Sequence, residues 1–177
     1  MQRIVLTFGL IAGAILSVMM LLTIPFHDQI GFDRSLIIGY TTMVLAFLMI
    51  FAGVRTYRDN VAGGTVSFGK ALQVGLLIML IASVCYVATW EFVYHSIAPD
   101  YLDKYAAYSL EKLKQSGASA EQVAAKAQEM AKFKTMYQNP LVNIAFTLLE
   151  PLPVGLLFTL LAAAVLSRKR RTQEVVA

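Results

Sequence analysis

The stretch ALQVGLLIMLIASVCYVATW, residues 71–90, decides the fold, because it contains no charged residue. An α-helix rises about 1.5 Å per residue, so roughly 20 apolar residues cross a bilayer core of about 30 Å. Residues 4–24 and 36–54 have the same charge-free character. A fourth apolar stretch, residues 141–166, is interrupted only at Glu150-Pro151-Leu152-Pro153. We therefore predict an all-α integral membrane protein with four transmembrane helices over about 4–24, 36–54, 71–94 and 141–166.

The composition agrees with a chain that faces lipid. Hydrophobic residues make up 58% of the 177 residues and charged residues 15%. Soluble domains are nearer to about 45–50% apolar and about 25% charged. The composition therefore argues against a soluble globular domain and against a disordered chain. We expect one membrane domain over residues 1–177. The only cysteine, Cys85, excludes an internal disulfide and lies inside an apolar stretch.

The basic residues predict the orientation in the membrane. The net charge is +4, and Lys and Arg concentrate in short cytoplasmic segments of membrane proteins. The predicted topology anchors close the second and fourth spans: Arg55, Arg58, Arg168, Lys169, Arg170 and Arg171. We expect both termini, residues 56–70 and the basic tail 167–177 to be cytoplasmic, with residues 26–35 and 98–140 outside. A basic run beside a span is typical of attraction to anionic headgroups, so we expect the lipid bilayer as partner and no nucleic acid.

The long connection, residues 98–140, is predicted to form two helices joined by a turn at Ser116 and Gly117. Ser119 and Gln122 match a capping box at the start of the second helix. Apolar residues recur at helical spacing in both halves, and lysines and acids occupy the other faces. The two helices could pack on each other, lie on the membrane, or form an external docking module. Because so small a hairpin buries little apolar surface alone, we expect self-association or an envelope protein partner.

Two acids inside apolar spans are the candidate functional residues, Glu91 and Glu150. Ionisable groups in a span are costly and frequently functional. Both lie nearer the outer end of their span, where they could be interfacial and structural or could form a proton or cation site. Pro151 and Pro153 predict a kink just after Glu150.

A stripe of small residues on the first span, Gly9, Gly13 and Ser17, predicts close packing against a neighbouring helix. His27 and His95 are expected near the headgroups rather than in a metal site. The segment Gly64–Ala71 approaches a phosphate-binding loop but has alanine where the pattern requires Ser or Thr. We therefore expect no nucleotide, metal or other cofactor, and the sequence contains no catalytic motif that predicts an enzyme.

Five segments carry a family resemblance: Gly39-Tyr40-Thr41-Thr42-Met43-Val44, Tyr57-Arg58-Asp59-Asn60 with Gly63-Gly64, Ser67-Phe68-Gly69-Lys70-Ala71, Trp90-Glu91, and Glu150-Pro151-Leu152-Pro153-Val154-Gly155. Over nearly the whole chain they resemble a bacterial family catalogued as domain of unknown function 4199. The resemblance implies a multi-span protein of the bacterial inner membrane and adds no mechanism.

Two functions follow as hypotheses. The first is a non-enzymatic membrane component that acts by association with itself or with an envelope protein, through residues 98–140. The alternative is a small oligomeric transporter or channel-like unit that uses Glu91 and Glu150.

Overall fold

The computed structural model describes residues 1–167, and every regular element in that part of the chain is a helix. The order is α1 (Gln2–Thr23), η1 (Ile24–Phe26), α2 (His27–Ile30), α3 (Phe32–Asn60), α4 (Phe68–Phe92), η2 (Val93–Ile97), α5 (Tyr101–Gln115), α6 (Ala120–Tyr137), α7 (Pro140–Leu149) and α8 (Pro151–Leu166). The predicted all-helical fold is confirmed. The predicted anchors Arg168, Lys169, Arg170 and Arg171 lie outside the described residues.

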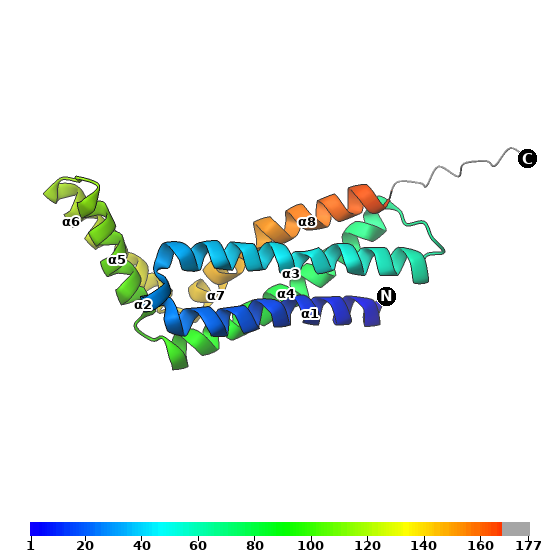
Figure 1. Ribbon diagram of the computed structural model, residues 1–177, viewed down its shortest axis with the longest axis horizontal. Helices are drawn as coiled ribbons and strands as arrows, with labels where there is room; N and C mark the ends of the chain where they lie inside the picture. The colour runs from blue at the N-terminus through cyan, green and yellow to red at the C-terminus, as the bar shows by residue number, and fades with distance from the viewer. Residues whose placement is uncertain (168–177) are drawn as a thin grey trace, which may run out of the picture.

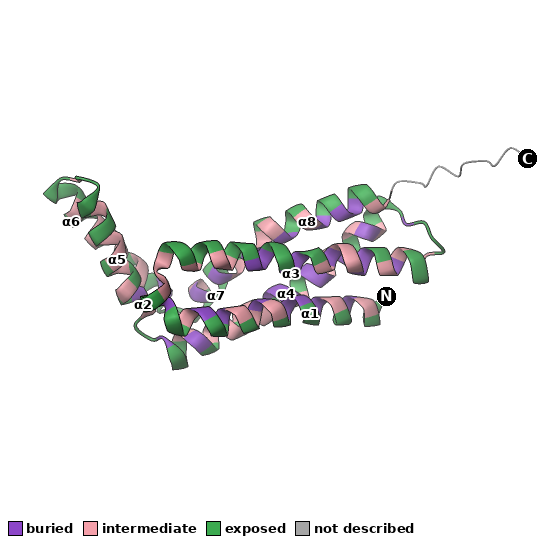
Figure 2. Cartoon of the chain, in the orientation of Figure 1, coloured by how far each residue is buried: buried purple, intermediate pink, exposed green. Residues whose placement is uncertain are grey.

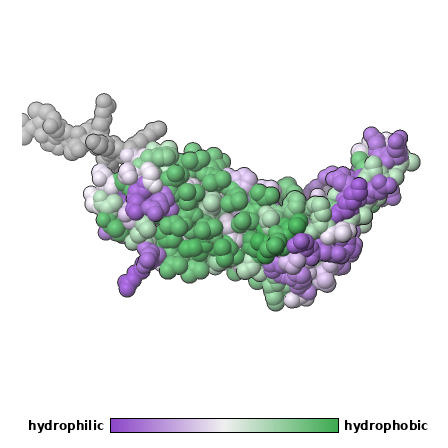
Figure 3. Space-filling model, turned by 180° about the vertical axis from the view of Figure 1, so that it is seen from behind, coloured by the Kyte–Doolittle hydropathy of each residue, from purple (hydrophilic) through white to green (hydrophobic). Residues whose placement is uncertain are grey.

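Four helical stretches are long and apolar enough to cross a membrane, as predicted. They are Gln2–Ile30, Phe32–Asn60, Phe68–Ile97 and Pro140–Leu166. The first three extend beyond the predicted spans by several residues, whereas the fourth begins only one residue earlier, at Pro140. On the face of the bundle seen in Figure 3, a wide apolar belt covers the middle, and hydrophilic residues gather towards the two ends.

The two short connections are tighter than the sequence indicated. Residues 26–35 are mostly helical, and the chain reverses at Gly31, whose φ of +85° is accessible to glycine at little cost. Helix α3 continues to Asn60, so the connection to α4 spans only residues 61–67. Ser67 caps the start of α4 by accepting a hydrogen bond from the backbone N–H of Lys70.

Helix α4 is the centre of the bundle and packs against α1, α3, α7 and α8 (Figure 1). The core contains fully buried side chains from α3 and α4, among them Phe47, Ile50 and Ile78. Buried positions line the inward faces of the helices, whereas the outward faces are exposed leucine, isoleucine and valine (Figure 2). This distribution is typical of a bundle whose outer surface faces lipid.

Helices α1 and α4 run side by side in the same direction and pack through the small-residue stripe. A Cβ atom on Gly9 would lie 2.8 Å from Ile81 Cβ, and one on Gly13 would lie 2.7 Å from Cys85 Cβ. One turn further along, the Thr89 hydroxyl donates to Ser17 Oγ at 2.7 Å. The three contacts are four residues apart on both helices, so they form one continuous seam. The small-residue stripe of α1 therefore packs against α4 of the same chain.

The segment between α4 and α7 folds into a helical hairpin, α5 and α6, which leaves one end of the bundle obliquely (Figure 1). The chain turns at Gly117, with φ of +83°. Ser119 and Gln122 form both hydrogen bonds of a capping box at the start of α6. Asn139 then caps α7 through its side chain, and Pro140 occupies the first turn of α7, where its missing N–H costs nothing.

Candidate functional site

The last span is broken at Glu150, which lies between the end of α7 at Leu149 and the start of α8 at Pro151. Pro151 and Pro153 have no N–H, so the carbonyl groups of Thr147 and Leu149 lose their usual helical donors. The Glu150 N–H instead donates to the carbonyl of Thr147 at 3.4 Å. Glu150 follows the ten residues of α7, about 15 Å along the span. The carboxyl group therefore lies within the apolar stretch and not at its end.

Glu150 has one side-chain partner, a hydroxyl from the central helix. The Tyr86 hydroxyl donates to Glu150 Oε2 at 2.5 Å. Within residues 1–167, no lysine, arginine or histidine forms an ion pair with Glu150. The residue is exposed on the surface of the bundle. In the part of the chain that the structure describes, the carboxyl group therefore has a hydroxyl partner and no positive charge to compensate it.

A buried polar group adjoins the break on the side of the hairpin. We call it the Trp90 cluster, and it consists of Trp90, Tyr137, Asn143 and Thr147, each less than 9% exposed. The indole N–H of Trp90 donates both to Tyr137 Oη at 2.9 Å and to Asn143 Oδ1 at 3.1 Å. The Thr147 hydroxyl donates to Asn143 Oδ1 and lies 3.2 Å from Tyr137 Oη. These bonds tie α4, α6 and α7 together at one level of the bundle.

Burial changes the pKa of Tyr137, the residue of this cluster that belongs to the hairpin. Removal from water raises the pKa of Tyr137 above its ordinary value, and the carboxylates of Glu150 and Glu91 act in the same direction. The bonds from Trp90 and Thr147 act against that shift. Tyr137 therefore remains a neutral hydroxyl at physiological pH, able both to donate and to accept.

Glu91 occupies a different setting from Glu150. Its Oε2 lies 3.3 Å from Nε2 of His95, one turn further along, while its Oε1 is buried without a hydrogen-bond partner. The His95 side chain is 63% exposed. In the part of the chain that the structure describes, no hydrogen bond joins Glu91 to Glu150. The carboxylates of both acids nevertheless act on Tyr137, so whether they form one site stays a prediction.

An aromatic clamp fastens the hairpin to the bundle. The ring of Phe32, at the start of α3, contacts the rings of Tyr101, Tyr105 and Tyr108 on α5 at centroid distances of 5.6, 5.5 and 5.0 Å. His27 also packs on Phe32 and Tyr101 and is only 3% exposed. The folded hairpin therefore covers His27, and its predicted level near the headgroups stays a prediction.

Two ion pairs support the clamp. Lys104 lies 2.8 Å from Asp28, and Lys112 lies 2.7 Å from Asp33, so that α5 is joined to α2 and α3. The bond to each aspartate raises the pKa of Lys104 and of Lys112 above the ordinary lysine value. Burial raises the pKa of the nearby Tyr101 to about 12. Exposed ion pairs contribute little stability, so the rings dominate the attachment.

We expect Phe32→Ala to loosen the hairpin. Each aromatic contact contributes about 0.5–1.5 kcal/mol, and loss of about 1.4 kcal/mol makes opening about tenfold more frequent. Limited digestion with trypsin in mild detergent should therefore cut the α5–α6 segment about tenfold faster than in the wild type. Phe26→Ala is the matched control, because Phe26 is 51% exposed and lies in the same connection. Equal cleavage of Phe32→Ala and wild type would show that the rings do not hold the hairpin.

Tyr86, Asn143 and Thr147 were not predicted as site residues from the sequence. A signal was available, because Asn143, Thr147 and Glu150 recur at intervals of four and three residues and so share one helix face. Polar side chains on one face of an apolar span are typical of contact with another polar helix face. Tyr86 and Trp90, one turn apart on α4, are that second face.

The comparisons identify a family without an assigned activity. The model of the family described as "Protein of unknown function (DUF4199)" matches residues 7–168. No curated protein and no solved structure matches the chain.

Proposed function

Since the chain belongs to the DUF4199 family, whose description names no activity, we propose a function from its own geometry: a small oligomeric transport unit that takes up and releases protons at Glu150. The observation that carries the proposal is a carboxyl group inside an apolar span, at a helix break, with a tyrosine hydroxyl as its side-chain partner. We place the protein in the bacterial inner membrane, with both termini cytoplasmic, on the distribution of Lys and Arg.

A carboxylate within the hydrocarbon layer is costly unless something neutralises it. Neutralisation by a proton needs no further ligand. The Tyr86 hydroxyl holds Oε2 in place, and within residues 1–167 Oε1 forms no hydrogen bond. The broken helix adds backbone carbonyls that lack their usual donors, a feature of substrate sites in transporters. Reversible neutralisation at this depth is the elementary step of proton transfer across a membrane.

The exposed position of Glu150 supports an oligomer. Four spans enclose a packed core and leave Glu150 on the outer surface of the bundle. A path for protons past this group then requires a wall from outside the chain, and a second copy supplies one with the same chemistry. Glu91 and the exposed His95 stand nearer the end of α4, where we propose that they exchange protons with water.

Association with an envelope protein through the hairpin takes second place. The hairpin is fastened to its own bundle by the Phe32 clamp, and most of its lysines pair with acids of the same chain. We retain self-association and propose that the protein is not an enzyme.

Proton flux into liposomes tests the proposal. The full chain is reconstituted with a pH-sensitive dye inside, and a potassium gradient with valinomycin drives proton entry. We expect flux above that of empty liposomes, and Glu150→Gln should reduce it at least tenfold, because the amide cannot carry the proton. Glu121→Gln, on the exposed start of α6, is the matched control and should leave the flux unchanged.

Either of two results would overturn the proposal. One is a wild-type flux no greater than that of empty liposomes, and the other is full activity of Glu150→Gln. Flux that depends on a sodium gradient, with none for protons, would contradict the proton as the transported ion. Circular dichroism of each variant checks that the helices are intact.

A further inference from the structure

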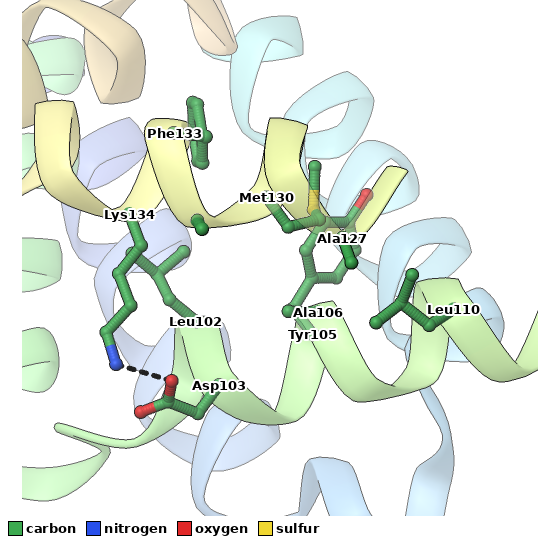
Figure 4. Close-up of a pocket in the computed structure, with 10 residues that line it drawn as sticks. Leu102, Asp103, Tyr105, Ala106, Leu110, Ala127, Met130, Phe133 and Lys134 are labelled. Atoms are coloured by element: carbon green, nitrogen blue, oxygen red, sulfur yellow. Dashed lines mark hydrogen bonds and ion pairs between the residues drawn. The ribbon is translucent and has the colours of Figure 1, made fainter. Parts of the chain in front are cut away.

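The seam between α5 and α6 contains a hollow of about 220 Å³ (Figure 4). Its wall is apolar and comes from both helices, with Leu102, Tyr105 and Leu110 on α5 and Met130 and Phe133 on α6. One ion pair, between Lys134 and Asp103, bridges the two helices at its edge. The hollow is therefore an apolar space with a polar rim.

Alanines explain why the seam is not filled. Lys134 pairs with Asp103, and in an antiparallel hairpin this register sets Ala131 opposite Ala106, and Ala127 opposite Leu110. Each pair contains at least one alanine, whose methyl group is too short to fill the seam. Protein interiors are close-packed, and an apolar hollow lined in this way favours an apolar guest over water.

The wall of the hollow contacts one of the helical stretches that are apolar enough to cross a membrane. The Phe133 ring, in its wall, contacts the Phe146 ring at a centroid distance of 5.4 Å. Phe146 belongs to α7, which begins the fourth span, and is 40% exposed on the surface of the bundle. The apolar belt of the bundle reaches the base of the hairpin (Figure 3). Two aromatic rings in contact therefore link the exposed apolar surface of α7 to the wall of the seam.

We propose that this hollow holds an acyl chain of a phospholipid from the adjoining leaflet. The charges nearest to the seam already have partners in the same chain, Lys134 with Asp103 and Lys126 with Glu129. A peptide partner would meet no unmatched charge there, whereas an acyl chain needs none. This site is independent of the proposed proton transfer, because it involves neither Glu150 nor Tyr86.

Photolabelling tests the proposal on the full chain in vesicles. The vesicles contain phosphatidylethanolamine and phosphatidylglycerol, with a trace of phosphatidylethanolamine that has a diazirine on one acyl chain. We expect light to label peptides of α5 and α6 as well as the spans. Ala127→Leu fills the hollow and should lower labelling of the hairpin at least fivefold. Ala125→Leu makes the same change on the exposed face of α6 and should leave it unchanged.

Three outcomes would overturn the proposal. They are an unlabelled hairpin in the wild type, equal labelling of Ala127→Leu and wild type, and a disulfide-linked dimer of Ala127→Cys in a Cys85→Ala background. The last would assign the seam to a second copy of the chain. If circular dichroism shows that Ala127→Leu does not fold, Ala106→Leu fills the same hollow from α5 and gives the same readout.

Discussion

Replacing Gly13 with leucine is expected to destabilise the bundle by about 3 kcal/mol and to lower Tm by about 6–12 °C. The Cβ of any side chain at this position would lie 2.7 Å from Cys85 Cβ and 2.8 Å from Cys85 Sγ. Cys85 belongs to the central helix and cannot withdraw without moving α4. Helices α1 and α4 must therefore separate, which breaks the contacts at Gly9 and Ser17 as well. Thermal unfolding in mild detergent, followed by circular dichroism, measures the shift.

Gly39→Leu is the matched control for this prediction. Gly39 also lies within a span, but a Cβ there would meet no atom within 4 Å. Replacing a helical glycine without a clash improves helix propensity, so the control should be neutral or slightly stabilising. If the two variants melt at the same temperature, the packing of α1 on α4 does not limit the stability of the bundle.

Replacing Asn143 with leucine is expected to cost about 2 kcal/mol. The substitution keeps the volume of the side chain but removes the oxygen that accepts hydrogen bonds from Trp90 and Thr147. Polar groups left without partners in a buried site cost about 1–3 kcal/mol, and hydrogen bonds between membrane helices are at the lower end of such values. Denaturation in a mixed detergent measures the loss.

Trp90 reports on the same change directly, because it is the only tryptophan of the chain. We expect its emission to shift when the indole N–H loses Asn143 and keeps only Tyr137. Gln138→Leu, at an exposed position just before α7, controls for added hydrophobicity and should leave both stability and emission unchanged. Unchanged emission and stability in Asn143→Leu would contradict the role of the Trp90 cluster.

The number of spans could be predicted from the sequence because it depends on length and charge alone. Residues 4–24 and 36–54 contain no charge and are long enough as helices to cross a bilayer core. The ends of the spans were less predictable, since a single glycine, Gly31, reverses the chain within one residue. A pattern of apolar residues does not distinguish such a turn from a short loop.

The candidate site was predictable only in part. Glu150 and its two prolines stand out in an apolar stretch, so the break was visible in the sequence. The partner of Glu150 was not, because Tyr86 lies 64 positions earlier and an aromatic residue in a span has many other roles. His27 is buried because the hairpin, residues 101–137, folds back over it. The pattern of residues around His27 in the sequence does not indicate a contact with so distant a segment.

The parallel seam between α1 and α4 also constrains how the protein is made. The face of α1 with Gly9, Gly13 and Ser17 is synthesised first, but its partner positions Ile81, Cys85 and Thr89 belong to the third span. The stripe on α1 is therefore synthesised before the surface on which it packs. The contact between α1 and α4 can form only after α4 has been made, so this part of the bundle assembles late in synthesis.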